Sequence, residues 1–302
     1  MNYAPVALFV YNRPWHTRQT VEALMANAEA PETPLYIFSD SPRNIEASKA
    51  VEEVRTYISG IAGFKSLSII ERSHNFGLAG SIIDGVTRVC QQHGRVIVLE
   101  DDLVTSRYFL RYMNDGLTLY ENDRCVISIH GYVYPVKADL PETFFLMGAD
   151  CWGWATWKRG WDMFVSDGNQ LLDALKKKNL TRRFDYDGAY PHTKMLKEQI
   201  KGKNDSWAIR WYASAYVKGM LTLYPKSSLV QNIGFDNSGT HCGTNDSMSV
   251  ELAQLPIHVD RIPVMENTEA RKKIVMFLYL TRITSLFRRF AKFFQKNLIR
   301  QA

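Results

Sequence analysis

The sequence predicts an α/β fold, with a mostly parallel sheet flanked by helices and an amphipathic C-terminal helix. Two observations predict the sheet and its helices. In the first hundred residues, short apolar runs alternate with segments whose apolar residues recur at helical spacing. These runs are apolar throughout, as strands covered on both faces are. The length of 302 residues and the 46% hydrophobic content suit a folded chain with a full core.

The expected elements follow in order from the N-terminus. The apolar runs predict strands in "PVALFVYN", "PLYIFSD", "KSLSIIERS" and "RVIVLEDD". Helical spacing predicts the intervening helices at residues 17–27, in "NIEASKAVEEVRTYISGI" and in "GLAGSIIDGVTRVCQQHG", which Gly94 ends. After about residue 110, short strands mix with helices and long polar loops. This change predicts two tightly fused lobes (1–110 and 111–265), followed by a tail (266–302).

The charge and the cysteines limit the function classes. The net charge is +6, but residues 271–302 hold nine Lys/Arg and no acid, so the rest of the chain is slightly acidic at −3. This distribution excludes a uniformly basic nucleic-acid binder. The four cysteines are widely spaced, with no CxxC pair, and suit a reducing cytoplasm. The N-terminus lacks the features of a secretory signal.

Polar residues follow three of the predicted strands, at Asn12-Arg13, at Ser39-Asp40 and at Glu100-Asp101-Asp102. In open parallel sheets, ligands bind beyond the carboxyl ends of the strands, near a topological switch point. Adjacent acids at such a position are typical of a site for Mg²⁺ or Mn²⁺, because the metal offsets their mutual repulsion. The alternative is a solvated loop, or a helix that Asp101 or Asp102 caps.

The segment "CWGWATWKRGW" contains four tryptophans within a span of ten residues. Sugars stack their apolar faces on aromatic rings, so Trp152 and the nearby Asp150 are predicted to belong to the site. Residues 154, 157 and 161 fall on one helical face, so Trp157 and Trp161 are predicted to pack in the core.

The segment "VIVLEDDLVTSRYFLRYM" resembles GT-A glycosyltransferases, especially the N-acetylglucosaminyltransferase I group, in which a Glu-Asp-Asp triplet follows an apolar strand. The similarity continues in the same order and spans roughly residues 5–245, through "CVISIHGYVY", "GADCWGWATWKRGWDMF", "NDSWAIRWY" and "SSLVQNIGFDNSGTHCG". Bacterial sugar transferases of surface-polysaccharide pathways share this pattern. A polar insertion around residues 166–200 departs from it on the acceptor side.

The resemblance implies a nucleotide-sugar-binding fold of the GT-A type, in which the first lobe (1–110) would bind the nucleotide-sugar and the second (111–265) the acceptor. It also implies a role for each site residue. Asp102 would bind a divalent metal, Mn²⁺ or Mg²⁺, that bridges the donor diphosphate, and His241 would meet the metal or the diphosphate. Asp205 would be the general base that activates the acceptor hydroxyl. The donor would be bound by Arg13, Asp40, Glu100 and Asp101. Asn75, in "HNFGLAGSIIDG", is predicted to lie near the nucleotide, and a contact of Asp40 with the nucleotide base favours a UDP-sugar.

Two consequences follow for the mechanism. One base and a direct attack on the face opposite the leaving group would invert the anomeric centre. No second carboxylate is assigned that would serve a retaining double displacement. The residues themselves leave another interpretation of Asp205 open, because Asn204 or Asp205 could simply cap the helix that starts near Trp207.

The tail forms a separate signal. Aromatic and aliphatic residues recur at helical spacing from Tyr279 to Leu298, with Arg and Lys between them. The apolar run at 274–280 is too short to span a bilayer. A basic, Phe-rich amphipathic helix is suited to the interface of an anionic membrane. The alternative is a helix that packs on the body.

The sequence therefore predicts a metal-dependent, inverting hexosyl- or N-acetylhexosaminyltransferase. It would move a sugar from a nucleoside diphosphate to a glycan or lipid-linked glycan in bacterial surface-polysaccharide assembly. It would be peripheral on the inner face of the cell membrane. One alternative is a nucleotidyltransferase, although "YNRPWHT" lacks the glycines of that family's first loop. The other is a membrane-associated glycan-binding protein without catalysis.

Overall fold

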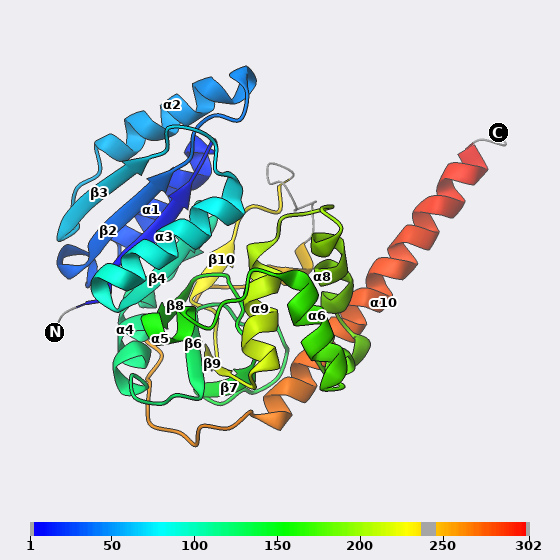
Figure 1. Cartoon of the computed structure of the whole chain (residues 1–302). Coiled ribbons are helices and arrows are strands. Elements are labelled where there is room, and N and C mark those ends of the chain that lie inside the picture. Colours follow the sequence, from blue (N-terminus) through cyan, green and yellow to red (C-terminus); the bar gives the residue numbers. More distant parts are fainter. Residues whose placement is uncertain (1–2, 237–245, 300–302) are drawn as a thin grey trace.

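A computed structural model describes residues 3–236 and 246–299. An eight-stranded mixed sheet forms its centre, in the order β3-β2-β1-β4-β8-β6-β9-β7 (Figure 1). The strands are β1 (Val6–Val10), β2 (Pro34–Ser39), β3 (Ser66–Glu71), β4 (Arg95–Glu100), β6 (Val126–His130), β7 (Thr143–Met147), β8 (Trp154–Trp157) and β9 (Leu221–Pro225). A small second sheet pairs two antiparallel strands, β5 (Leu103–Thr105) and β10 (Val230–Asn232).

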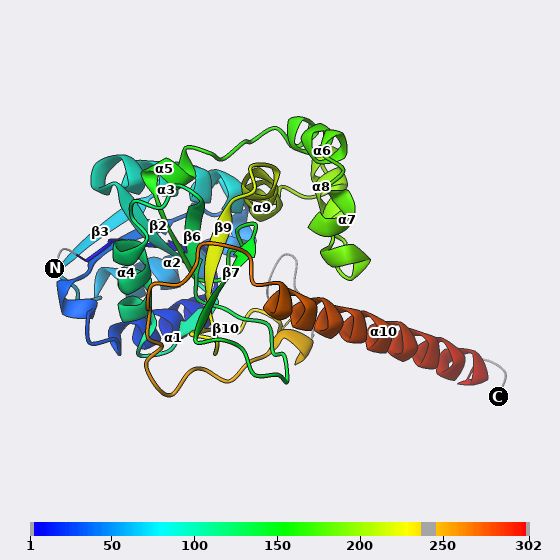
Figure 2. The same ribbon diagram turned by 90° about the horizontal axis from the view of Figure 1, so that it is seen from below.

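Helices cover both faces of the large sheet (Figure 2). The helices of the described residues are α1 (Pro14–Met25), α2 (Ile45–Ser59), α3 (Gly77–His93), α4 (Phe109–Leu119), α5 (Lys158–Trp161), α6 (Gly168–Lys177), α7 (Thr181–Phe184), α8 (His192–Ile200), α9 (Trp207–Val217) and α10 (Thr268–Ile299), of which α6–α8 and most of α10 lie away from the sheet. Short 3₁₀ turns lie at η1 (Ala30–Glu32), η2 (Tyr186–Gly188) and η3 (Asp246–Met248). We call α6, α7, η2 and α8 together the insertion.

The first half of the chain forms a parallel sheet, which confirms the predicted α/β fold. β1 pairs in parallel with β2 on one side and with β4 on the other, and β2 pairs in parallel with β3. The chain therefore winds outward from β1 to β3 and then returns to β4, across β1. The topological switch point lies between β1 and β4, where Leu8 is in register with Leu99. Helix α1 begins at Pro14, earlier than the predicted start at residue 17.

The second half adds strands of both directions. β8 lies antiparallel between β4 and β6, and β9 runs parallel to β6. The prediction of one helical face for residues 154, 157 and 161 is wrong, because 154–157 is strand β8 and the helix begins at Lys158. Trp154 and Trp157 instead point to opposite faces of the sheet, since they belong to different core clusters. The predicted burial of Trp157 and Trp161 is confirmed.

The core continues across the predicted lobe boundary at residue 110. One cluster lies on the α4 face of the sheet and another lies between α3, α5 and α9. Gly85 of α3 lets that helix approach the sheet, because a Cβ there would come within 2.6 Å of the Phe9 ring. A third cluster joins the insertion, α9 and the start of α10. The division into lobes stays a prediction.

Helix α10 leaves the body of the molecule along most of its 32 residues (Figures 1 and 2). Ala270, Ile274 and Leu278 are buried against the body, whereas Leu280 and Ile283 are exposed. The start of the tail therefore packs on the body, as the alternative interpretation predicted. In the described part of the chain, no helix combines the length and apolarity needed to cross a bilayer.

Candidate functional site

The carboxyl ends of β1 and β4 bring Arg13 and the acidic triplet together. Arg13 follows β1, and its Nη2 bonds to Asp101 Oδ1 and, at 3.0 Å, to Asp102 Oδ2. We call Arg13 and the triplet Glu100–Asp102 the switch-point site. The alternative of a helix cap is wrong, because β5 follows the triplet and Tyr108 stands at the start of α4.

The two aspartates of the switch-point site are buried and Glu100 is half-buried, and the three carboxyls outnumber the one cation, Arg13. Asp101 is 4% exposed and Asp102 8%. Burial, followed by Asp102 and Asp101, raises the pKa of Glu100 to about 8. Burial also raises the pKa of Asp101 to about 6, where Asp102 adds to the rise and Arg13 opposes it. For Arg13, burial lowers the pKa, but the attraction of Asp101 and Asp102 outweighs it and the pKa is raised.

Backbone contacts fix the two aspartates in place. The Thr20 hydroxyl of α1 donates to the carbonyl of Asp101 at 2.8 Å, and the Ile233 amide donates to the carbonyl of Asp102 at 2.9 Å. Gly234 lies directly against the Asp102 carboxylate and leaves no room for a Cβ. The segment that follows β10 therefore covers the triplet.

That covering segment brings a further pair into the site. His16 of α1 is buried, and its Nε2 lies 3.0 Å from Asp236 Oδ2. The sequence predicted no role for His16, Gly234 or Asp236, although they lie in "YNRPWHT" and "SSLVQNIGFDNSGTHCG". Their order along the chain gave no sign that these segments meet. His241, the predicted metal or diphosphate ligand, lies outside the described residues.

Asp40 and Asn75 are joined to each other at the neighbouring strand end. Asp40 Oδ1 accepts hydrogen bonds from the Ser41 amide at 2.9 Å and the Phe76 amide at 2.8 Å. Asn75 Nδ2 donates to Asp40 Oδ2 at 3.2 Å and to the Ser41 carbonyl at 2.6 Å. These bonds tie the end of β2 to the loop before α3, beside the switch point. A contact of Asp40 with a nucleotide base stays a prediction.

Asp150 and Trp152 lie between β7 and β8, near the triplet. Asp150 Oδ2 accepts from the Tyr224 hydroxyl at 2.7 Å and the Tyr134 hydroxyl at 3.4 Å. Burial raises the pKa of Asp150, and these two bonds partly oppose the rise. Burial and then the carboxylates of Glu100, Asp150 and Asp102 raise the pKa of the Cys151 thiol, so these acids share one neighbourhood.

Trp152 stands in an aromatic corner. Its ring centroid lies 4.7 Å from that of Tyr132 and 5.5 Å from that of Phe235. Its backbone amide donates to His130 Nε2 at 3.1 Å, at the carboxyl end of β6. A partly buried aromatic ring beside carboxylates is suited to hold the apolar face of a sugar.

Asp205 lies at the surface, just before α9. Its side chain is 74% exposed, and its Oδ1 accepts from Arg210 Nη2 at 2.9 Å. The alternative in which Asn204 or Asp205 caps α9 is wrong, because the Ser206 hydroxyl accepts from the Ile209 amide at 3.3 Å as the cap. β9, which follows α9, runs in the direction of β4, so α9 starts at the edge of the sheet that carries the triplet. No described contact joins Asp205 to the triplet.

The switch-point site suits a divalent cation in its chemistry. Its two buried carboxylates are hard oxygen donors. The raised pKa values of Glu100 and Asp101 indicate that burial and mutual repulsion disfavour the charged forms of these carboxyls. Among the described residues, no cluster of three or more His, Cys, Asp or Glu could by itself hold a metal ion. A cation here would therefore need ligands from elsewhere, and Mg²⁺ commonly takes them from substrate phosphates and water.

Because His130 is buried, we expect the folded protein to lose stability in acid. Burial lowers the pKa of His130 to about 3, so the folded protein keeps it neutral, whereas the unfolded chain binds a proton below about pH 6.5. The free energy of unfolding should fall by ~1.4 kcal/mol per pH unit below pH 6.5 on account of this residue. Urea unfolding of His130→Gln between pH 7 and 5 should show a shallower fall. The exposed His258→Gln should keep the wild-type slope, and an unchanged slope in His130→Gln would contradict the assignment.

Comparisons with known proteins reach only distant likenesses. No protein-family model matches the chain, and no curated protein does. It resembles the mannosyltransferase PcManGT from Pyrobaculum calidifontis, solved with GDP-Man and Mn²⁺, at 14% identity and a TM-score of 0.32 over 44% of this chain and 36% of that one. It resembles S. aureus TarS at 10% identity and a TM-score of 0.41, over 75% and 36% of the two chains. It resembles S. aureus TarS 1-349, solved with UDP-GlcNAc, at 9% identity and a TM-score of 0.40, over 75% of this chain and 57% of that one. The alignments thus span less than two thirds of these proteins.

Proposed function

We propose that the chain is a metal-dependent, inverting GT-A-type glycosyltransferase. It moves a hexose or N-acetylhexosamine from a nucleoside diphosphate to a glycan hydroxyl in bacterial surface-polysaccharide assembly. The observation that carries the proposal is the pair of buried aspartates at the switch point between β1 and β4, bridged by Arg13. Ligands of open α/β sheets bind at this point, and paired carboxylates there suit a cation that meets a diphosphate.

Each residue of the switch-point site has a separate task in this proposal. Asp102 holds Mn²⁺ or Mg²⁺, which when bound supplies Lewis-acid stabilisation of the departing diphosphate. Arg13 keeps the carboxylates of Asp101 and Asp102 side by side despite their repulsion. Glu100 and Asp101 face the ribose and the donor sugar. His241 completes the metal or diphosphate contacts.

The donor lies between the strand ends and the aromatic corner. Asp40 and Asn75, beside the end of β1, stand on the nucleotide side of the first lobe (1–110), and we favour UDP as the nucleotide. Asp150 and Trp152 stand on the sugar side, where the Trp152 ring offers an apolar face. The second lobe (111–265) receives the acceptor.

Asp205 acts as the general base in this proposal. Its exposed carboxylate can reach an acceptor hydroxyl, and Arg210 fixes one of its oxygens. The buried Arg210 guanidinium also donates to the carbonyls of Ser206 and Ser166, so its position is set by three separate bonds. With one base and a direct displacement, the anomeric centre inverts.

The class of function is tested by binding of the donor. UDP with Mn²⁺ should raise the melting temperature of the wild-type protein, and Mn²⁺ or UDP alone should raise it less. Asp102→Asn should lose the metal-dependent part of the shift. Asp173→Asn, an exposed acid on α6, serves as the control and should keep it. If no nucleoside diphosphate stabilises the wild-type protein with Mn²⁺, the proposal is wrong.

The role of Asp205 is tested by the rate of sugar transfer in a variant that lacks its carboxylate. Asp205→Asn should lower kcat about 10²- to 10⁴-fold, the usual contribution of a general base, and leave the shift with UDP and Mn²⁺ unchanged. Donor consumption in the presence of acceptor measures the rate. Full transfer by Asp205→Asn would remove this residue from the mechanism while leaving the class of function intact.

We also propose that α10 attaches the protein to the inner face of the cell membrane. Residues 271–302 hold nine Lys/Arg and no acid, and the helix extends beyond the part that packs on the body (Figure 2). Basic residues near an anionic surface each contribute about 1 kcal/mol to binding. Such attachment would bring the site to a lipid-linked acceptor.

A truncation tests the attachment without disturbing the body. Ending the chain after Thr284 removes five Lys/Arg but keeps the buried Ile274 and Leu278. The truncated protein should lose most of its binding to phosphatidylglycerol vesicles in a flotation assay and keep its melting temperature. Equal flotation of both forms would contradict the membrane role of α10.

A further inference from the structure

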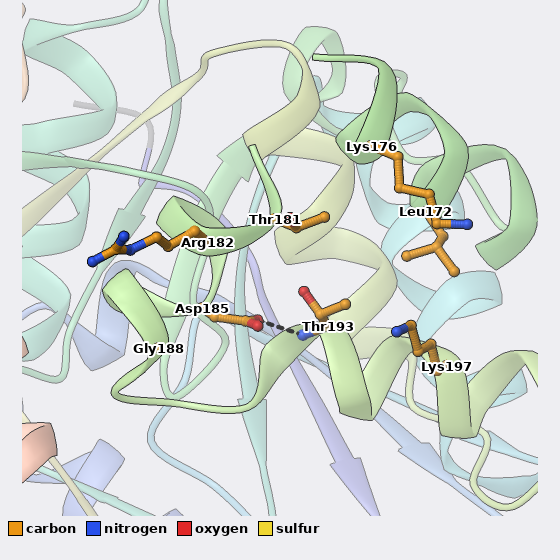
Figure 3. Close-up of a pocket in the computed structure, with 8 residues that line it drawn as sticks. All are labelled: Leu172, Lys176, Thr181, Arg182, Asp185, Gly188, Thr193 and Lys197. Carbon is orange, nitrogen blue, oxygen red and sulfur yellow. Dashed lines mark hydrogen bonds between the residues drawn. The ribbon is translucent and has the colours of Figure 1, made fainter. Parts of the chain in front are cut away.

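A pocket of about 470 Å³ lies in the insertion, apart from the switch-point site (Figure 3). Lys176 of α6 and Thr181 of α7 face Thr193 and Lys197 of α8 across it. Arg182 also lines the pocket, but its guanidinium points away from these four side chains (Figure 3). Residues with hydroxyl and ammonium groups, from three helices, thus line one space.

Two of these groups have no partner in the protein. The Thr193 hydroxyl is buried and makes no hydrogen bond. The Lys197 ammonium forms no ion pair or hydrogen bond with the described residues, whereas Lys194, on the same helix, lies 3.8 Å from Glu198. Thr193 and Lys197 are four residues apart on α8 and therefore share a face. A buried hydroxyl without a partner costs stability unless a ligand or water meets it.

The charge of the pocket favours an anion. Lys176 and Lys197 outnumber its one carboxylate, Asp185, although Lys176 also lies 3.5 Å from Asp173. Oδ1 of Asp185 already accepts the Thr193 amide at 2.6 Å. From 168 to 200 the insertion holds seven Lys/Arg and four Asp/Glu. Lysine side chains and threonine hydroxyls are donors that suit the oxygens of a phosphate group.

The rim of the pocket is joined to α10. Gly188 lines the pocket, and its carbonyl accepts from Arg282 Nη1 at 2.5 Å. The neighbouring Asp187 pairs with Arg271 at 2.7 Å, and its carbonyl accepts from the Tyr279 hydroxyl at 2.8 Å. Asp187 has φ of +58°, a strained conformation that these contacts hold in place. The basic helix and the pocket therefore keep a fixed relation to each other.

The insertion is also fastened to the helix that follows Asp205. The Val165 amide, just before the insertion, donates to the Ser214 hydroxyl at 2.9 Å, and Lys178 Nζ, directly after α6, donates to the Val217 carbonyl at 2.8 Å. Both acceptors lie on α9, which begins two residues after Asp205. The pocket thus belongs to the side of the molecule that carries the proposed base.

We propose that this pocket binds a phosphate ester group, through Lys197, Thr193, Lys176 and Thr181. The group belongs to a phosphorylated acceptor or to a phospholipid headgroup that meets the protein beside α10. The anion site stands on the pocket alone, and only its assignment to the acceptor side rests on the proposed function. Its ligand is separate from the donor diphosphate, which the switch-point site receives.

Binding of inorganic phosphate to the full-length protein tests the site. Calorimetric titration at constant ionic strength, with chloride as the reference anion, should show binding by the wild-type protein. Lys197→Met keeps the apolar stem of the side chain and should weaken binding about tenfold to a hundredfold, the effect of losing one charge-assisted hydrogen bond. Thr193→Val should weaken it less. Lys194→Met, on the same helix outside the pocket, should bind as the wild type does.

Vesicles and a soluble ester identify the source of the phosphate. If Lys197→Met weakens binding of both phosphatidylglycerol vesicles and glycerol 3-phosphate, the headgroup is the ligand. If it weakens binding of glycerol 3-phosphate alone, a soluble or acceptor-borne ester is the ligand. Either result supports the site. Absence of phosphate binding by the wild type, or equal binding by Lys197→Met, overturns it.

The melting-temperature shift with UDP and Mn²⁺ distinguishes a failure of the phosphate site from a failure of the proposed function. Lys197→Met should retain the full shift, because the pocket does not touch the switch-point site. A lost phosphate response with a retained nucleotide shift supports both proposals. A lost phosphate response in a protein that never responds to nucleotide supports the pocket and rejects the transferase.

Discussion

The bridge from Arg13 to Asp101 and Asp102 is the interaction on which the candidate site depends. It exists because the strand order sets the ends of β1 and β4 beside each other, although the residues are about ninety positions apart in the chain. Without the guanidinium, two buried carboxylates would face each other in a medium that screens charge poorly. The raised pKa values of Glu100 and Asp101 indicate that the charge of Arg13 does not fully offset burial and the repulsion among the carboxylates. A site in this state gains stability from any further positive charge that reaches it.

The sequence predicted the parallel half of the sheet well, because its strands are short, wholly apolar and separated by helices of clear periodicity. It failed at β8, where tryptophans three residues apart imitate a helical face but lie on opposite sides of a strand. Spacing alone does not distinguish these cases when both faces are buried. For α9, the alternative interpretation placed the cap at Asn204 or Asp205, yet Ser206 performs it. Asn, Asp and Ser are all good caps, and only the backbone decides among three in a row.

The sequence predicted residues of the candidate site only where a charged residue follows the end of a predicted strand. That rule found Arg13, Asp40 and the triplet. It missed His16 and Asp236, whose pairing depends on β10 lying across the small sheet against β5. It also missed Arg210, because a guanidinium inside a helix gives no sign in the sequence of which neighbour it holds. Contacts between segments far apart in the chain carry no local pattern, so they appear only with the fold.

Helix α10 has a mechanical consequence that concerns orientation. Its 32 residues span about 48 Å, and each residue turns the helix by about 100°. Removing one residue beyond Thr284 would shorten the helix by only about 1.5 Å but would rotate everything after it by more than a quarter turn. Removing seven would nearly restore the phase. If the far half of the helix rests on a surface, the position of the body above that surface is thus set by the phase of the helix and hardly by its length.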